Sequence, residues 1–319
     1  MRKHTIFNIS LAIAIVIAST FSTFIFANPV GIASGNKSGT NWPMAEDILN
    51  KCSTVASPIK NVISDGSLDN IYKITGSPDT QYGIIQADAL AFQAGRDPQM
   101  MKKIVMVFPF FSTEFHLVTK AGSPIKSLTD LSGKRVVEGP EGSGTWVSVQ
   151  LIKALTGLQW QPVLANQVEG MNMVINGQAD AEWIVAGRPV SIIADASKKG
   201  SIKLIPIQHP ALDTYKLYTK TMLPTGSYAG QTASLQTYKV DNILATFAYK
   251  NQYQKEISEL VTCIAKNVGV LQKPADQGGG HPKWKDVEID DINRIQWPYH
   301  PAAKAAIDAE IKRQNRNNK

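Results

Sequence analysis

Residues 134–155 read KRVVEGPEGSGTWVSVQLIKAL, and this stretch decides the fold. Its start, Arg135 to Val137, predicts a short buried strand, and Gly139 to Gly144 form a loop rich in glycine. A helix is predicted over 145–155, because apolar residues recur there at helical spacing, at Trp146, Val149, Ile152 and Leu155. A strand, a glycine loop and a helix in this order are typical of an α/β protein.

The glycine loop also predicts an anion site, because free N–H groups and the positive end of a helix dipole converge there. Its spacing nearly fits a phosphate-binding P-loop, but Thr145 stands where the lysine should be, and Glu141 would repel a triphosphate. The three-glycine spacing of a dinucleotide fingerprint is absent. Gly142, Ser143, Gly144 and Thr145 instead suit a carboxylate, which needs two or three donors. An ordinary tight turn between strand and helix is the alternative.

The N-terminus indicates export. Arg2 and Lys3 precede an apolar run from Ile9 to Ala18, and Ile25-Phe26-Ala27 offers a small-residue cleavage site. This order predicts a signal peptide over residues 1–27 and a periplasmic mature protein. An uncleaved membrane anchor is the alternative. The whole chain carries a net charge of +7, and +5 once Arg2 and Lys3 are removed. Its lysines are scattered rather than clustered, so nucleic acid is not expected as a partner.

Two cysteines, Cys52 and Cys263, are too few for a disulfide scaffold and too far apart in sequence for metal-ligand spacing. In an oxidising compartment we expect them to form one bridge, with two buried free thiols as the alternative. No nucleophile elbow, zinc motif or cysteine–histidine signature occurs, so we expect no catalytic residue, no metal and no cofactor.

Strand and helix patterns alternate along the chain, which predicts mostly parallel sheets with helices on both faces. The expected strands are 30–33, 61–64, 82–86, 104–108, 114–119, 135–137, 162–165, 181–185, 215–222 and 237–247. One helix is expected to begin at Pro43, and six further helices are expected over 67–74, 88–94, 145–155, 168–176, 254–270 and 301–313. About 290 residues outside the signal suit two lobes better than one core.

The order of these segments resembles the TAXI family, the extracytoplasmic solute receptors of TRAP transporters. The motifs that carry the resemblance cover nearly the whole mature chain: Gly39-Thr40-Asn41-Trp42-Pro43, Asp65 to Asn70, Gln86-Ala87-Asp88, Leu128 to Val136, Gly142 to Thr145, Gly177 to Ala181, Pro224 to Gln231 and His300-Pro301. The chain departs from the family at Ala186-Gly187-Arg188-Pro189, where a Gly-Gly-Val-Pro-like turn is usual. This departure puts an arginine near the expected cleft, so the ligand is expected to differ from the family's glutamate-like or dicarboxylate ligands.

The resemblance implies a two-lobe fold like that of periplasmic binding proteins, with hinge strands between the lobes. We place lobe I at 28–117 plus 222–319 and lobe II at 118–221. The chain would catalyse no reaction and would act as a monomeric receptor that delivers a carboxylate-bearing organic anion or amino acid to a TRAP-type permease. A periplasmic enzyme or a sensor-linked binding protein is the alternative. The expected ligand-binding residues are Thr40, Asn41, Trp42, Ser67, Gln86, Asp88, Gly142, Ser143, Gly144, Thr145, Trp183, Gly187 and Arg188.

Several of these residues have a structural alternative. Asp88 meets a ligand ammonium or caps its own helix, which is the commoner role. Trp183 forms an aromatic wall or belongs to the core. Arg188 clamps a carboxylate with its guanidinium fork or is a surface cation. Glu114 and His116 line a cleft or are satisfied buried polar residues.

Overall fold

The computed structural model describes residues 29–248, 253–290 and 294–317. The predicted signal peptide, 1–27, lies outside these residues. In the part of the chain that is described, no helix is both long enough and apolar enough to cross a membrane.

One continuous sheet runs through both lobes, with the strand order β2-β1-β3-β10-β4-β7-β5-β6; β8 pairs with β4, and β9 pairs with β10. The first lobe contains β1 (Val30–Gly35), α1 (Asn41–Cys52), β2 (Ile59–Ile63), α2 (Ser67–Gly76), β3 (Tyr82–Gln86), α3 (Ala87–Arg96) and α4 (Pro98–Met101). The second contains η1 (Leu128–Leu131), β5 (Arg135–Val137), α5 (Gly144–Thr156), β6 (Gln161–Val163), α6 (Gln167–Asn176), β7 (Ala181–Ala186), α7 (Ser191–Lys198), β8 (Ile202–Ile205), α8 (Pro210–Asp213) and β9 (Thr219–Leu223).

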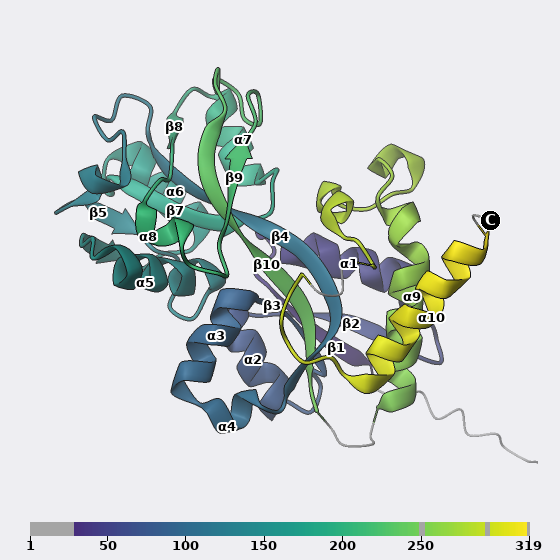
Figure 1. Cartoon of the computed structure of the whole chain (residues 1–319). Helices are drawn as coiled ribbons and strands as arrows, with labels where there is room; N and C mark the ends of the chain where they lie inside the picture. Colours follow the sequence, from purple (N-terminus) through teal and green to yellow (C-terminus); the bar gives the residue numbers. More distant parts are fainter. Residues whose placement is uncertain (1–28, 249–252, 291–293, 318–319) are drawn as a thin grey trace, which may run out of the picture.

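Two long strands, β4 (Ile104–Lys120) and β10 (Leu235–Phe247), join the lobes and pair antiparallel with each other (Figure 1). β10 pairs with β3 of the first lobe, and β4 pairs with β7 of the second. The outer strands β1, β2 and β3 are parallel, as are β5, β6 and β7. The expected parallel arrangement therefore holds within each lobe, whereas the two central strands run antiparallel.

The prediction of two separate strands at 104–108 and 114–119 was wrong, because β4 is one strand of 17 residues. Pro109 made a break plausible, since proline has no N–H for the ladder. Next to Pro109 the pairing with β10 shifts register: Ile243 pairs with Pro109 and Asp241 with Ser112, so β4 has one extra residue there.

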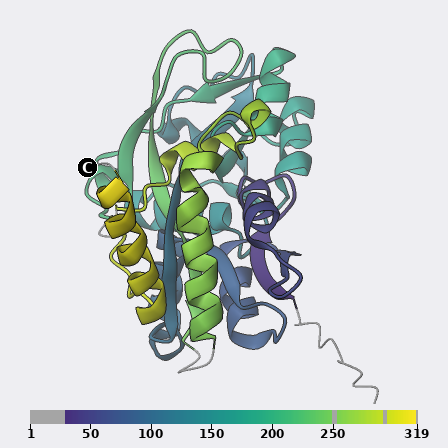
Figure 2. The same ribbon diagram turned by 90° about the vertical axis from the view of Figure 1, so that its right-hand side faces the viewer.

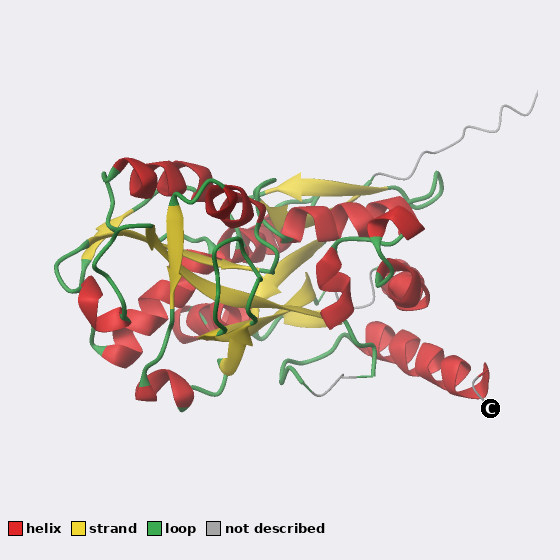
Figure 3. Cartoon of the chain, turned by 90° about the horizontal axis from the view of Figure 1, so that it is seen from above, coloured by secondary structure: helices red, strands yellow, loops and turns green. Residues whose placement is uncertain are grey.

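The C-terminal segment returns to the first lobe. It contains α9 (Gln254–Leu271), η2 (Ala275–Gln277), η3 (Pro282–Asp286) and α10 (Pro301–Asn317). α9 and α10 lie side by side along one face of the molecule (Figure 2). Seen from above, helices flank the strands on both sides (Figure 3). Ile257, Val261 and Ile264 of α9 are buried, as the apolar stripe of this helix predicts.

Cys52 and Cys263 form a disulfide, with their Cα atoms 5.8 Å apart, so the predicted bridge is confirmed. It ties the last residue of α1 to the middle of α9. Several elements differ from expectation. The strand predicted at 215–222 is reduced to β9; Tyr215 and Tyr218 precede it and pack against each other, and Tyr218 also packs against Phe115. α4, α7, β8 and α8 were not predicted.

Candidate functional site

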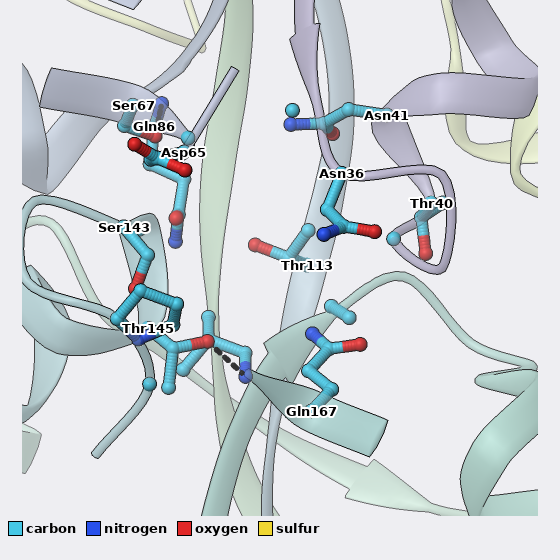
Figure 4. Close-up of a pocket in the computed structure, with 18 of the residues that line it drawn as sticks. Asn36, Thr40, Asn41, Asp65, Ser67, Gln86, Thr113, Ser143, Thr145 and Gln167 are labelled. Carbon is cyan, nitrogen blue, oxygen red and sulfur yellow. Dashed lines mark hydrogen bonds between the residues drawn. The ribbon is translucent and has the colours of Figure 1, made fainter. Parts of the chain in front are cut away.

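A cavity lies between the two lobes, with about 770 Å³ of space including its mouth. Seven of the expected ligand-binding residues line it: Thr40, Asn41, Ser67, Gln86, Ser143, Gly144 and Thr145. Figure 4 shows Ser67, Gln86, Ser143 and Thr145 on one side and Asn36, Thr40 and Asn41 on the other, with Thr113 between them. Segments that are far apart in the sequence therefore line one polar cavity.

Helix N-termini surround this cavity. The first residues of α1, α2, α5 and α6 line it, namely Asn41, Ser67, Gly144 and Gln167, and so does Gln86, which immediately precedes α3. Each helix start offers N–H groups without an intrahelical acceptor and the positive end of its dipole. No lysine, arginine or histidine is among the described lining residues, and Asp65 is the one ionisable side chain there. Any attraction that this lining exerts on an anion therefore comes from N–H groups and helix dipoles rather than from basic side chains.

The glycine loop has the geometry that its sequence predicts. The Ser143 hydroxyl oxygen accepts from the N–H of Trp146 at 3.1 Å and caps α5. The Thr145 hydroxyl oxygen accepts from the N–H of Val185 at 3.0 Å, the bond drawn in Figure 4. Both hydroxyls accept in these bonds, so both keep a proton that can be donated toward the cavity.

Gln86 lies between the two helix starts on the left of Figure 4. Its backbone N–H donates to the Ser67 hydroxyl at 3.2 Å. Its side chain rests so closely on Gly144 that a Cβ there would come 1.4 Å from Oε1 of Gln86. A side chain at position 144 would therefore displace the Gln86 amide from its place in the cavity wall. In the described structure, Nε2 of Gln86 is buried without a hydrogen-bond partner.

The hinge strands contribute lining residues that the sequence analysis missed. Thr113 comes from β4 and Asn242 from β10, and Asn36 and Gln167 add two further amides. Asn242 is fully buried and donates to the carbonyl oxygen of Phe111 at 3.1 Å. Its one sequence signal was an amide directly before the mostly apolar run 243–247, which periodicity alone does not mark as a site residue.

Asp88 does not line the cavity, and neither expected role for it was correct. Its carboxylate points across the lobe interface, where Ser148 of α5 donates to it at 2.6 Å and the Tyr218 hydroxyl at 3.1 Å. No side-chain bond caps α3. Full burial raises the pKa of Asp88 to about 6, although Ser148 and Tyr218 counteract the shift. This residue joins the lobes.

The two tryptophans also lie outside the cavity lining. Trp183 is buried in the main core beside Trp160, with ring centroids 6.3 Å apart, so the core interpretation is correct and the ligand wall is not. Trp42 follows the lining residue Asn41, but its ring lies under the Lys37 ammonium at 5.3 Å. These two tryptophans therefore do not line the cavity.

Gly142 and Gly187 contact the opposite lobe instead of lining the cavity. The carbonyl oxygen of Gly142 accepts from the N–H of Leu68 at 3.1 Å. The carbonyl oxygen of Gly187 accepts from the Thr40 hydroxyl at 2.9 Å. These two bonds join the lobes on either side of the cavity.

Arg188, expected to clamp a carboxylate of the ligand, instead pairs with Glu114 of the chain itself. Its Nε lies 3.6 Å from Oε1 of Glu114, and its backbone N–H donates to Oε2 at 3.0 Å. The buried Lys283 ammonium also binds Glu114, at 2.7 Å. Burial raises the pKa of Glu114, but the charge and hydrogen bond of Lys283, with the backbone N–H of Arg188, together outweigh burial and hold this pKa below its usual value.

His116 completes this group of satisfied polar residues. Its Nε2 lies 3.0 Å from the Tyr228 hydroxyl, and its Nδ1 lies 3.2 Å from the carbonyl oxygen of Ile184. Burial lowers its pKa to about 4, so the ring is neutral at physiological pH. Glu114 and His116 are thus structural, and among the described residues no group of three His, Cys, Asp or Glu could hold a metal.

Known structures share this two-lobe arrangement. One described as a periplasmic transporter has a TM-score of 0.55 and 16% identity, covering 90% of this chain and 97% of that one. The periplasmic binding protein BugD has a TM-score of 0.51 and 9% identity, covering 89% of this chain and 94% of its own. At such identities the likeness shows the fold. Residues 32–306 match the model of the NMT1-like family, and the chain belongs to that family.

Proposed function

We propose that the protein is an extracytoplasmic solute receptor of the TAXI type. It captures a small organic anion or amino acid through its carboxylate and delivers it to a TRAP-type permease. The convergence of helix N-termini on an inter-lobe cavity carries this proposal. N–H groups at helix starts are suited to binding anions, and a cavity between lobes can enclose a solute.

The two long strands suit the movement that such a receptor needs. β4 and β10 are continuous through both lobes, so small changes in their twist can rotate one lobe against the other. Closure around a solute would give the permease a distinct shape to recognise. We also propose that lobe I comprises residues 28–117 and 222–319, that lobe II comprises residues 118–221, and that the receptor is a monomer.

Export to the periplasm is supported by two features. The structural neighbours named above are described as periplasmic proteins, and the disulfide between Cys52 and Cys263 suits an oxidising compartment. The signal peptide over 1–27 is proposed from the sequence. Its cleavage can be checked by N-terminal sequencing of protein purified from the periplasmic fraction.

The binding function is tested by screening organic acids and amino acids for thermal stabilisation, followed by calorimetric titration of each positive compound. A receptor should bind one solute molecule per chain and leave it chemically unchanged after long incubation. Turnover of the solute would favour the enzyme alternative. Uptake into vesicles carrying a TRAP permease, dependent on this protein, would establish the delivery step; transport that proceeds equally without it would refute that step.

A further inference from the structure

We propose that the cavity selects a short monocarboxylate with a hydrogen-bond donor, a hydroxyl or an ammonium group, on the carbon next to its carboxylate. This inference rests on the proposed solute-binding function and narrows its ligand class. The feature that carries it is a pair of buried amide side chains, Gln86 and Asn242, in the cavity lining.

Gln86 and Asn242 are direct partners in the antiparallel pairing of β3 with β10. Residues opposite each other in such a pair project from the same face, with Cβ atoms about 4.5–5.5 Å apart. Gln86 is 4% exposed and Asn242 is 0% exposed. Two polar side chains from different strands therefore stand side by side, shielded from bulk solvent.

The orientation of the Asn242 amide is fixed by its neighbours. Its nitrogen donates to the carbonyl oxygen of Phe111 at 3.1 Å and lies 3.4 Å from the Thr113 hydroxyl oxygen. Because a carbonyl oxygen can only accept, the amide oxygen of Asn242 must point the other way. That oxygen is buried and has no hydrogen-bond partner in the described part of the chain.

The Gln86 amide presents the opposite chemistry. Its oxygen lies against Gly144, the first residue of α5, where backbone N–H groups lack intrahelical acceptors. Its nitrogen is buried and unpartnered among the described residues. A buried donor or acceptor without a hydrogen-bond partner costs free energy. A ligand that accepts a hydrogen bond from Nε2 of Gln86 and donates one to Oδ1 of Asn242 would satisfy both amides.

The charge of the lining limits the ligand to one carboxylate. The hydroxyl protons of Ser143 and Thr145 and the α5 N-terminus can bind one anionic group beside Gln86. A second carboxylate would find no basic side chain among the described lining residues, only the partial positive charges of the helix starts at Asn41, Ser67 and Gln167, and Asp65 adds a negative charge to the lining. Burying that charge unpaired would be unfavourable. A donor on the adjacent carbon would reach Asn242 while the carboxylate contacts Gln86.

Four probes test this by calorimetric titration of the wild-type protein: propanoate, 2-hydroxypropanoate, 2-aminopropanoate and butanedioate. At least one 2-substituted acid should bind about tenfold or more tightly than propanoate, since a buried acceptor would otherwise stay unmet. It should also bind more tightly than butanedioate. The stronger of the two 2-substituted acids identifies the donor as hydroxyl or ammonium.

Two variants then assign the contacts. Asn242→Ala should abolish the preference for the 2-substituted acid over propanoate, and Gln86→Met should weaken both about tenfold. Gln93→Met is the matched control, because Gln93 is also buried on α3, bonds to Tyr72 at 3.4 Å and lies outside the cavity lining. It should bind like the wild type.

Equal binding of propanoate and both 2-substituted acids, or preference for butanedioate, would overturn the inference while leaving a solute receptor in place. Binding of other solutes but none of these four would have the same meaning. No binding by any acid or amino acid in the wider screen would instead refute the proposed function. If a variant fails to fold, as judged by circular dichroism, the wild-type ranking of the four probes still decides the matter.

Discussion

The backbone N–H of Leu68, in the first turn of α2, donates to the carbonyl oxygen of Gly142 in the glycine loop at 3.1 Å. This bond brings the N-terminal ends of α2 and α5 together across the lobe interface. The Thr40–Gly187 bond does the same at the opposite side of the cavity. The structure thus describes lobes in contact, and opening of the cavity must break these bonds.

Gly144→Ala should disrupt binding without unfolding the protein. The added methyl group would overlap the Gln86 amide, which is the mobile end of a side chain and can be displaced. Loss of one amide contact to a carboxylate should weaken binding by about 1–3 kcal/mol. Calorimetry with the best ligand from the screen measures this. Gly157→Ala offers a poor comparison because its φ is 71°, whereas Gly76→Ala, in open space, is the suitable control.

Thr145→Val should affect both stability and binding. The variant removes the acceptor for the Val185 N–H and a hydroxyl that faces the cavity. A buried N–H left unmet costs about 1–3 kcal/mol, and the lost ligand bond a similar amount. Thr145→Ser keeps the hydroxyl and should retain most of the stability and most of the ligand affinity. Unchanged ligand affinity in Thr145→Val would remove Thr145 from the binding site.

Arg188→Met should leave ligand affinity and its salt dependence unchanged, because the guanidinium pairs with Glu114 outside the cavity lining. The partly exposed pair should contribute under about 1 kcal/mol to stability. Removing the buried Lys283 ammonium by Lys283→Met should cost more, about 3–5 kcal/mol, since it weakens the main pairing of buried Glu114. If Arg188→Met instead lowers ligand affinity, and the loss becomes smaller at high salt, Arg188 contacts the ligand and this prediction is wrong.

Asp88→Asn should change how stability depends on pH. The pKa of Asp88 is raised to about 6 from an ordinary 3.8, so the folded state favours the protonated form. Its favourable contribution is present below pH 3.8 and is lost as pH rises toward 6. Above pH 6, burying the charge costs about 3 kcal/mol. The variant should therefore gain stability relative to the wild type as pH rises from 4 to 7.

Urea unfolding of both proteins at several pH values measures this difference. Asp180→Asn is a control of opposite sign, because hydrogen bonds from Arg135 lower the pKa of Asp180. Its loss should cost stability at neutral pH, and that cost should fade as pH drops through the lowered pKa. A pH-independent difference between Asp88→Asn and the wild type would contradict the raised pKa.

Removing the bridge by Cys52→Ser with Cys263→Ser should lower stability by about 2–5 kcal/mol. The two cysteines are 211 residues apart, so the bridge closes most of the chain into a loop in the unfolded state. Denaturant unfolding with and without reductant measures the effect in the wild type. The double variant should be insensitive to reductant; a wild-type curve that reductant leaves unmoved would contradict this contribution.

Local patterns were sufficient to predict the elements that lie within one lobe. β3 and β5 have the predicted bounds, and α5 begins within one residue of its prediction. The hinge was less predictable, because β4 continues through Pro109 with a register shift in its pairing with β10, which no local pattern reveals. Short elements such as α8 (Pro210–Asp213) have too few residues to show a period.

The site was predictable where a local motif marks a helix start, as at Ser67, Gln86 and the glycine loop. Asn242 and Thr113 were missed, because they enter the cavity from hinge strands whose alignment depends on the whole sheet. Trp183 and Arg188 were wrongly predicted to line the cavity, for a related reason. Their side chains find partners within the protein, in Trp160 and Glu114, that no local pattern reveals.

Native mass spectrometry of the protein, purified from periplasm without denaturation, tests the central claim most directly. The account predicts one small molecule bound per chain, released on unfolding and identified as a carboxylate, that rebinds the wild type but binds Gly144→Ala more weakly. A released molecule without a carboxylate, equal rebinding by both proteins, or no bound molecule together with no binding by any screened acid or amino acid would contradict it.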